Sequence, residues 1–134
     1  IGYNLRCAQV TVFQDFNKTI GEAEISPPQY GALVLINANP GISQSAIASA
    51  LRFDRSTVVQ IIDRLVDRIL VVREVSATDR RSHALKLTDL GHNLLAKLNV
   101  LVNKHEQHMT RHLSGNERHT LMELLAQVYK EAED

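Results

Sequence analysis

The sequence has a single cysteine, no tryptophan and no long apolar segment, and its formal net charge is zero. Cys7 alone excludes an intramolecular disulfide, and without a CxxC pair we expect no zinc ribbon. No apolar run approaches the length of a membrane span and no signal peptide is visible, so we expect a soluble, cytoplasmic protein without a membrane partner. Catalytic-triad, paired-carboxylate and phosphate-loop motifs are also lacking, so the sequence supports no enzyme, cofactor or metal site.

The 134 residues suffice for one domain with a core, and their charge is unevenly distributed. Nucleic-acid-binding domains usually have a basic surplus, so the neutral total counts mildly against such a function. Residues 52–86, however, carry eight Lys and Arg residues against five Asp and Glu residues, whereas Glu131, Glu133 and Asp134 close the chain. This distribution predicts a locally basic module that binds a polyanion moderately and in a salt-dependent way.

Polar caps mark where most of the helices should begin. After an amphipathic segment over 3–20, a capping box at 26–29 predicts a helix that ends at 39–41. A short helix over 44–51 and a three-residue turn precede a helix with apolar residues at i, i+3, i+4 and i+7. Its apolar residues are Val58, Ile61, Ile62, Leu65, Val66 and Ile69. Two further helices begin at Thr88 and Ser114, and the last is expected to bury Leu121, Leu124, Leu125 and Val128.

Two β-biased runs, 70–75 and 83–87, are joined by a polar loop over 76–82. The resulting order predicts a mainly α fold with a small β-hairpin wing, that is, a winged helix-turn-helix with flanking dimerisation helices. We expect an N-terminal dimerisation helix over 1–24, a DNA-binding domain over 25–91 and C-terminal dimerisation helices over 92–134. The outer helices carry apolar stripes with no partner in so small a chain, which predicts a two-fold homodimer.

The polar face of the helix after Asp54 has side chains suited to reading double-stranded DNA, because Gln pairs bidentately with adenine and Arg with guanine. Arg64 has an alternative, since Asp63 and Asp67 are near enough in sequence to hold it in an ion pair. At the loop tip, Arg80 or Arg81 suits the minor groove and Asp79 is expected to orient it. The alternative for both regions is an ordinary solvated surface. The expected DNA-binding residues are Ser43, Gln44, Ser45, Arg55, Ser56, Thr57, Gln60, Arg64, Arg80 and Arg81.

Taken together, these motifs resemble the MarR family of winged helix-turn-helix regulators. The resemblance rests on the order and spacing of 26–30, 42–48, 54–58, 63–65, 79–81 and 87–91. It implies a homodimer that binds a pseudo-palindromic operator, usually as a repressor, is released by a small effector and has no enzymatic activity. One departure is Ile69, where the family usually has glycine. A β-branched residue is not expected to adopt a left-handed cap, so either the helix ends differently or the wing leaves at another angle.

The resemblance further suggests an aromatic acid, or a thioester derived from one, as the effector. Residues near the expected cleft would give an apolar lining, and the Arg6 guanidinium suits a carboxylate or phosphate. The alternative is that these residues belong to the dimer core and the surface. They are Tyr3, Arg6, Val10, Phe13, Tyr30 and Val34.

Three further hypotheses remain open. Cys7 suits a peroxide sensor, as in one branch of the family, but a buried structural cysteine is favoured because its position does not match that branch. His105, His108 and His112 have a spacing that can bind zinc, but a solvated or dimer-interface stripe is favoured because no partner ligands are apparent. The remaining alternative is a protein-interaction dimer that uses this fold without DNA.

Overall fold

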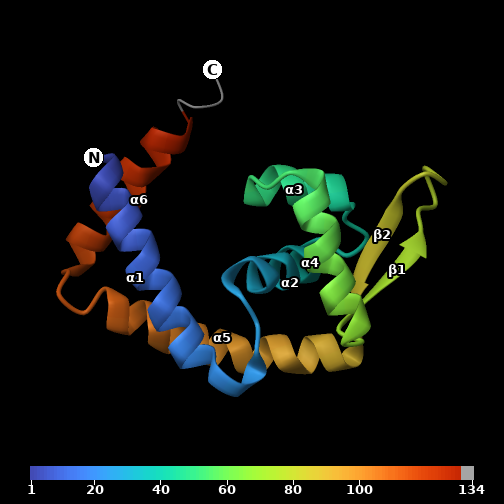
Figure 1. The fold of residues 1–134 in the computed structure, drawn as a ribbon, viewed down its shortest axis with the longest axis horizontal. Coiled ribbons are helices and arrows are strands. Elements are labelled where there is room, and N and C mark those ends of the chain that lie inside the picture. Colours follow the sequence, from blue (N-terminus) through green and yellow to red (C-terminus); the bar gives the residue numbers. More distant parts are fainter. Residues whose placement is uncertain (131–134) are drawn as a thin grey trace.

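The computed structural model describes residues 1–130, so the acidic residues at 131–134 lie outside it. Its order of elements confirms the expected mainly helical fold with a two-stranded hairpin (Figure 1). The bounds are α1 Gly2–Ile20, a 3-10 turn η1 Gly21–Ala23, α2 Pro27–Ala38, α3 Gln44–Leu51, α4 Arg55–Asp67, β1 Val71–Val75, β2 His83–Leu87, α5 Asp89–Met109 and α6 Gly115–Lys130.

The caps foreseen from the sequence are present. The Ser26 hydroxyl accepts from the N–H of Gln29 at 3.3 Å, and the Gln29 side chain accepts from the N–H of Ser26 at 2.9 Å, which completes a capping box. Ser43, Thr88 and Ser114 likewise accept from backbone N–H groups three residues on. These contacts satisfy N–H groups that the helix itself leaves unpaired, and they explain why these helices begin where they do.

One hydrophobic core unites the helix-turn-helix with the outer helices. Phe16 and Ile20 of α1 pack in the same cluster as Leu95 and Leu98 of α5. The expectation that these two helices lack partners on their own chain is therefore wrong: each buries a stripe against α2 and against the other. Their packing fixes α1 and α5 to the helix-turn-helix.

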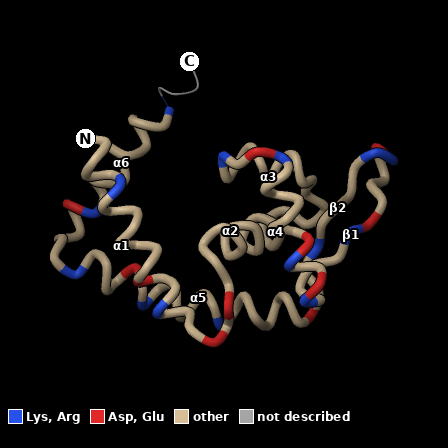
Figure 2. Tube along the Cα trace, in the orientation of Figure 1, with Lys and Arg blue, Asp and Glu red and all other residues tan. Residues whose placement is uncertain are grey.

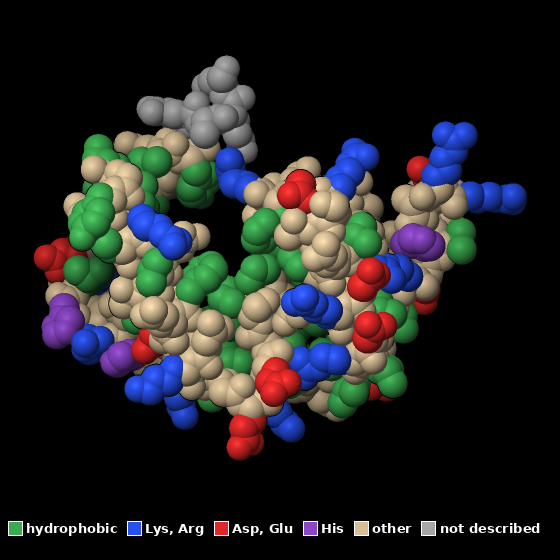
Figure 3. Space-filling model, viewed as in Figure 1, with side chains coloured by type: hydrophobic (Ala, Val, Ile, Leu, Met, Phe, Trp, Pro, Cys, Tyr) green, Lys and Arg blue, Asp and Glu red, His purple; other side chains and the backbone are tan. Residues whose placement is uncertain are grey.

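The last helix, α6, behaves differently. The burial expected for its apolar face is wrong for the single chain, because none of the α6 residues is buried. The side chains of this face remain 38–55% exposed: Leu121, Leu124, Leu125 and Val128. We call these four residues the α6 apolar face. Figure 3 shows hydrophobic side chains gathered over α1 and α6.

The wing is held to the helix-turn-helix by more than its own hairpin. β1 and β2 pair antiparallel, with Val71 opposite Leu87 and Val75 opposite His83. The segment before α3 adds a third, one-residue bridge: Gly41 donates to the Leu85 carbonyl at 2.8 Å, and Leu85 donates to that of Ile42 at 3.0 Å. This bridge was not predicted from the sequence, and it connects the start of the helix-turn-helix to the wing.

The junction between α4 and the wing corrects the expectation for Ile69. Its φ is 59°, so the β-branched residue does adopt the left-handed conformation. Its N–H donates to the Val66 carbonyl at 2.9 Å and that of Leu70 donates to the Leu65 carbonyl at 3.0 Å, which is a Schellman motif. Ile69 is also 66% exposed, so it does not belong to the apolar stripe of α4. Leu70 and Val71, which follow directly, are buried, and their packing requires the chain to turn at Ile69.

In Figure 1, α1, α5 and α6 form one arm of the molecule and α2, α3, α4 and the wing form the other, with the start of α5 running beneath the second arm. The described helices include none that is long and apolar enough to cross a bilayer.

Candidate nucleic-acid interface

The start of α4 presents a polar, exposed surface. Asp54 caps the helix, with its carboxylate 2.7 Å from both the Thr57 N–H and the Ser56 hydroxyl. The hydrogen bond from Ser56, and after it that from Thr57, hold the pKa of Asp54 below its usual range. Arg55, Ser56 and Gln60 are exposed and Thr57 is half-buried. The positive end of the helix dipole and these donors favour contact with phosphates and base edges.

The wing tip carries Arg80 and Arg81, both exposed, at the far end of the hairpin (Figure 2). The Asp79 carboxylate accepts from the backbone N–H of Arg81 at 2.9 Å. Ser76 donates its N–H to the Ser82 carbonyl at 3.2 Å, which closes the loop. Asp79 thus acts on the loop backbone, which leaves both guanidinium groups at the surface.

A polar bridge connects these two surfaces, and sequence reasoning did not find it. The Arg73 side chain on β1 donates to the Gln44 side chain on α3 at 2.9 Å and forms an ion pair with Asp63 on α4. Ser43 is occupied as the α3 cap, whereas Ser45 is exposed. The Gln44 side chain, expected to contact DNA, is hydrogen-bonded to the wing through its Oε1 in this structure. A glutamine on α3 and an aspartate on α4 that both bind one strand arginine leave no local pattern in the sequence.

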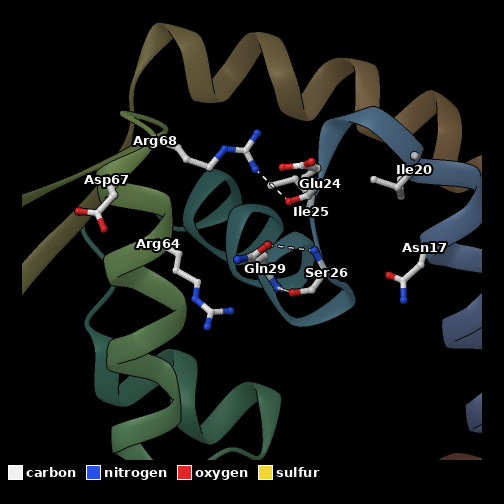
Figure 4. A pocket seen from close by; sticks show the side chains of 10 residues that line it. Asn17, Ile20, Glu24, Ile25, Ser26, Gln29, Arg64, Asp67 and Arg68 are labelled. Carbon is white, nitrogen blue, oxygen red and sulfur yellow. Dashed lines mark hydrogen bonds between the residues drawn. The ribbon is translucent and has the colours of Figure 1, made fainter.

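Arg64 lies two turns along α4, in the wall of a cavity of about 570 Å³ between α1, the start of α2 and α4 (Figure 4). The alternative of an ion pair between Arg64 and Asp63 is not realised, since Asp63 binds Arg73. Arg68 beside it donates to the carbonyls of Ala23 and Glu24 at 2.9 and 3.0 Å. The structure thus places Arg64 in the cleft between the two arms, apart from the polar surface at the start of α4.

A second, mainly apolar cavity of about 190 Å³ lies between α1, α2 and α5. Two of the expected effector residues, Phe13 and Tyr30, line it. The other four, Tyr3, Arg6, Val10 and Val34, line neither of these two cavities. The Tyr30 hydroxyl lies 2.8 Å from Oδ1 of Asn99, and burial, with Glu106 nearby, raises the pKa of Tyr30. The lining residues are Val12, Phe13, Phe16, Pro27, Tyr30, Val102, His105 and Glu106.

The structure corrects the expectations for Cys7 and the histidines. Cys7 is exposed in the chain, not buried. His105 is only 3% exposed, and its Nδ1 lies 2.7 Å from Oδ2 of Asp15, while Nδ1 of His108 lies 2.9 Å from Oδ1. Hydrogen bonding, chiefly from His105, lowers the pKa of Asp15. His105 and His108 thus join α5 to α1, and of the three stripe histidines His108 and His112 remain exposed. Within residues 1–130, no group of three or more His, Cys, Asp or Glu is arranged for a metal ion.

Comparison with known proteins decides the family. A family model described as the MarR family matches residues 23–82. A protein of Thauera aromatica, named as a putative transcriptional regulatory protein for the hcr operon, is 39% identical over 132 residues, which cover 98% of this chain and 80% of the relative. The chain belongs to the MarR family.

Solved structures of similar MarR-family proteins agree with the fold. The transcriptional repressor CouR bound to a 23-mer DNA duplex is 40% identical, with a TM-score of 0.91 over 96% of this chain and 92% of CouR. CouR bound to p-coumaroyl-CoA is 39% identical, with a TM-score of 0.90 over 98% of this chain and 92% of CouR. This MarR-family chain is therefore a transcriptional regulator with a winged helix fold, and not an enzyme.

Proposed function

We propose that this MarR-family regulator is a homodimeric repressor that binds a pseudo-palindromic operator in the cytoplasm. Residues 25–91 would bind DNA, and 1–24 with 92–134 would form the dimer. The observation that carries the proposal is the exposed polar start of α4 together with an arginine-tipped wing, joined by the Arg73 bridge. In a two-fold dimer, two such units would face successive turns of the major groove. The likeness to DNA-bound CouR supports this arrangement.

The roles differ along the interface. Gln60 and Arg55 would read base edges at the start of α4, whereas Ser56 and Thr57 would contact phosphates. Arg80 and Arg81 would reach the adjacent minor groove. Ser45 is free to meet a phosphate from the start of α3, while Ser43 and Gln44 support the fold of the interface. Arg64 is assigned no more than a phosphate contact, given its place in the cleft.

Selection from randomised duplexes tests the proposal, and an enriched two-fold motif is the expected result. Replacing Arg80 and Arg81 together with alanine should weaken binding and reduce the magnitude of the salt slope by about one for each lost phosphate contact. Gln60→Ala should change sequence preference instead. Lys104→Ala on α5 is a matched control that removes a charge away from the interface. Failure to enrich any duplex would favour the rival function, a protein-interaction dimer.

We also propose that the effector is an aromatic acid or its coenzyme A thioester. The cavity between α1, α2 and α5 supports this, because Phe13, Phe16 and Tyr30 give it an aromatic lining with few polar groups. The likeness to CouR bound to p-coumaroyl-CoA favours an aryl thioester. A ligand that releases DNA must bind the DNA-incompetent conformation more tightly, and that difference limits the effect.

Thermal-shift screening of aromatic carboxylates and their coenzyme A thioesters tests the effector. An effector should raise the melting temperature and lower operator affinity. Val102→Phe, which fills the cavity, should abolish both effects, whereas Val100→Phe on the exposed side of α5 should not. Arg6→Ala tests whether that guanidinium assists from outside the cavity. A compound that stabilises the protein without changing DNA binding is not the effector.

A further inference from the structure

Helix α6 meets the helix-turn-helix through an aromatic residue near its end. α6 contributes no residue to the hydrophobic core of the described chain. At its start, the Arg118 side chain donates to the Thr110 carbonyl at 3.1 Å, which holds α6 to the end of α5. Near its other end, the guanidinium carbon of Arg52 lies 5.1 Å from the centroid of the Tyr129 ring. This cation–π contact joins the two arms of Figure 1 on the side opposite α5.

Arg52 is rigidly connected to the start of α4. It ends α3 in the left-handed conformation, with φ 57° and ψ 41°, and its N–H donates to the carbonyls of Ala48 and Ser49. Only Phe53 separates it from Asp54, the cap of α4. A change in the position of the Arg52 side chain should therefore move the turn between α3 and α4. This turn sets the direction of α4, the helix proposed to read DNA.

We propose that Tyr129 is a positioning residue for DNA binding: through Arg52 it fixes where each α4 lies relative to α6. The inference rests on the proposed homodimer, in which the α6 apolar face packs against a second copy. Tyr129 directly follows Val128 of that face, so dimerisation would fix the Tyr129 ring relative to the two-fold axis. The contact then sets the distance between the two α4 helices, and with it the half-site spacing that the dimer accepts.

The strength of the contact suits alignment rather than assembly. An exposed cation–π pair corresponds to about a two- to five-fold factor in an equilibrium constant. That is too small to hold a dimer together, but it is enough to favour one orientation of α4 over its neighbours. The contact needs the ring face and not the hydroxyl, so phenylalanine should replace tyrosine without loss.

A distance measurement between the two protomers tests the proposal without DNA. In a Cys7→Ser background, Ser56→Cys places one spin label on each α4 of the dimer. We expect a narrow distance distribution in the wild type and with Tyr129→Phe, and a broader one with Tyr129→Ala. Gln127→Ala, an exposed neighbour on another side of α6, is the control and should leave the distribution narrow. Arg52 is left unchanged because it has interactions beyond this ring.

A spacing series then tests the consequence for DNA. Duplexes with one or two base pairs added or removed between the selected half-sites should bind the wild type much more weakly than the optimum. Tyr129→Ala should lose about two- to five-fold per protomer at the optimum and little at other spacings, which flattens the profile. The proposal is overturned if Tyr129→Ala leaves the distance distribution narrow, weakens all spacings equally or dissociates the dimer, or if Tyr129→Phe behaves like Tyr129→Ala. A selection that enriches no duplex refutes the proposed function, while the distance measurement still decides the role of Tyr129.

Discussion

Ile69 shows how one residue can hold an unfavourable conformation because its neighbours require it. Its φ of 59° costs about 1–2 kcal/mol for an ordinary L-residue, and the side chain recovers little because it is 66% exposed. The burial of Leu65 before it and Leu70 after it in the core outweighs this conformational cost. Position 69 therefore holds strain that a residue without a Cβ would not.

Replacing Ile69 with glycine should stabilise the protein by about 1 kcal/mol, since the relief of strain exceeds the greater chain entropy that glycine loses on folding. Chemical denaturation measures the change. Ile69→Val, which keeps the β-branch, should have little effect. A loss of stability in the glycine variant would mean that the exposed isoleucine side chain makes a contribution larger than the strain.

Gly91 is required for a different reason. A Cβ at this position would overlap the carbonyl oxygen of Leu70, which is backbone and cannot move aside. We expect Gly91→Ala to lower the free energy of unfolding by about 1–3 kcal/mol, because α5 must shift away from the wing base. Gly115→Ala is the matched control, since nothing lies within 4 Å of its Cβ position. Equal effects of the two substitutions in urea denaturation would refute the close-approach argument.

At the scale of elements, the starts of the helices were the part that the sequence predicted well. Caps such as Ser43 and Asp54 act on N–H groups three residues away, so the information is local. The pairs that hold the elements together were missed because their partners are distant in sequence: Asp15 binds His105, and Arg73 reaches back to Gln44. The reading of Ile69 failed because tertiary packing overrode a local preference.

The surface placement of the candidate interface was predictable to a similar degree. Polar residues at the start of α4 and at the wing tip could be named, because helix periodicity and turn residues place them at the surface. The apolar cavity could not be outlined, since it is formed by side chains from three helices. Phe16 and Val102 line it although each fits an ordinary core stripe, and nothing in the local sequence separates those two roles.

The joint between α1 and α5 should be sensitive to acid. The lowered pKa of Asp15 means that its carboxylate stabilises the folded state. The sign follows: this contribution is fully present above the ordinary value near 3.8 and is lost as the pH falls through the lower folded-state pKa. Asp15→Asn should therefore lower the melting temperature at pH 5–7, on the order of a pH unit or more above that value, and the difference from the wild type should shrink toward pH 3.

The control for this joint is Glu22→Gln, which removes an exposed carboxylate from η1. Melting curves recorded from pH 3 to pH 7 should show no pH-dependent difference between this variant and the wild type. If the Asp15→Asn difference persisted unchanged at pH 3, then the contact between α1 and α5 would depend on shape and not on the Asp15 charge.

The α6 apolar face remains exposed to solvent in the single chain. Four aliphatic side chains in a stripe on one helix form a patch that proteins rarely leave in water. Their partial exposure contrasts with the well-packed core formed by α1 to α5. This contrast is why we assign α6 to an interface between two copies.

Placing aspartate at Leu121 and Leu125 should convert the proposed dimer to a monomer. A buried charge without a partner costs on the order of 3 kcal/mol or more, so the dimer dissociation constant should rise more than about a hundredfold. Analytical ultracentrifugation measures the mass. Gln127→Asp on another side of the helix should remain dimeric. A doubly substituted chain that still sedimented as a dimer would place the interface elsewhere.

The two arginines of the wing stand at the tip of a loop that its own hydrogen bonds hold closed, on a chain of zero net charge. For a regulator that acts as we propose, this arrangement affects how fast the protein finds its operator as well as how tightly it binds there. Sequence-independent affinity grows with the number of phosphates that a protein neutralises, so a chain whose basic residues are balanced by an equal number of acidic ones should dissociate readily from wrong sites. Such a repressor spends little time on non-cognate DNA, and occupancy of its operator can follow changes in effector concentration promptly.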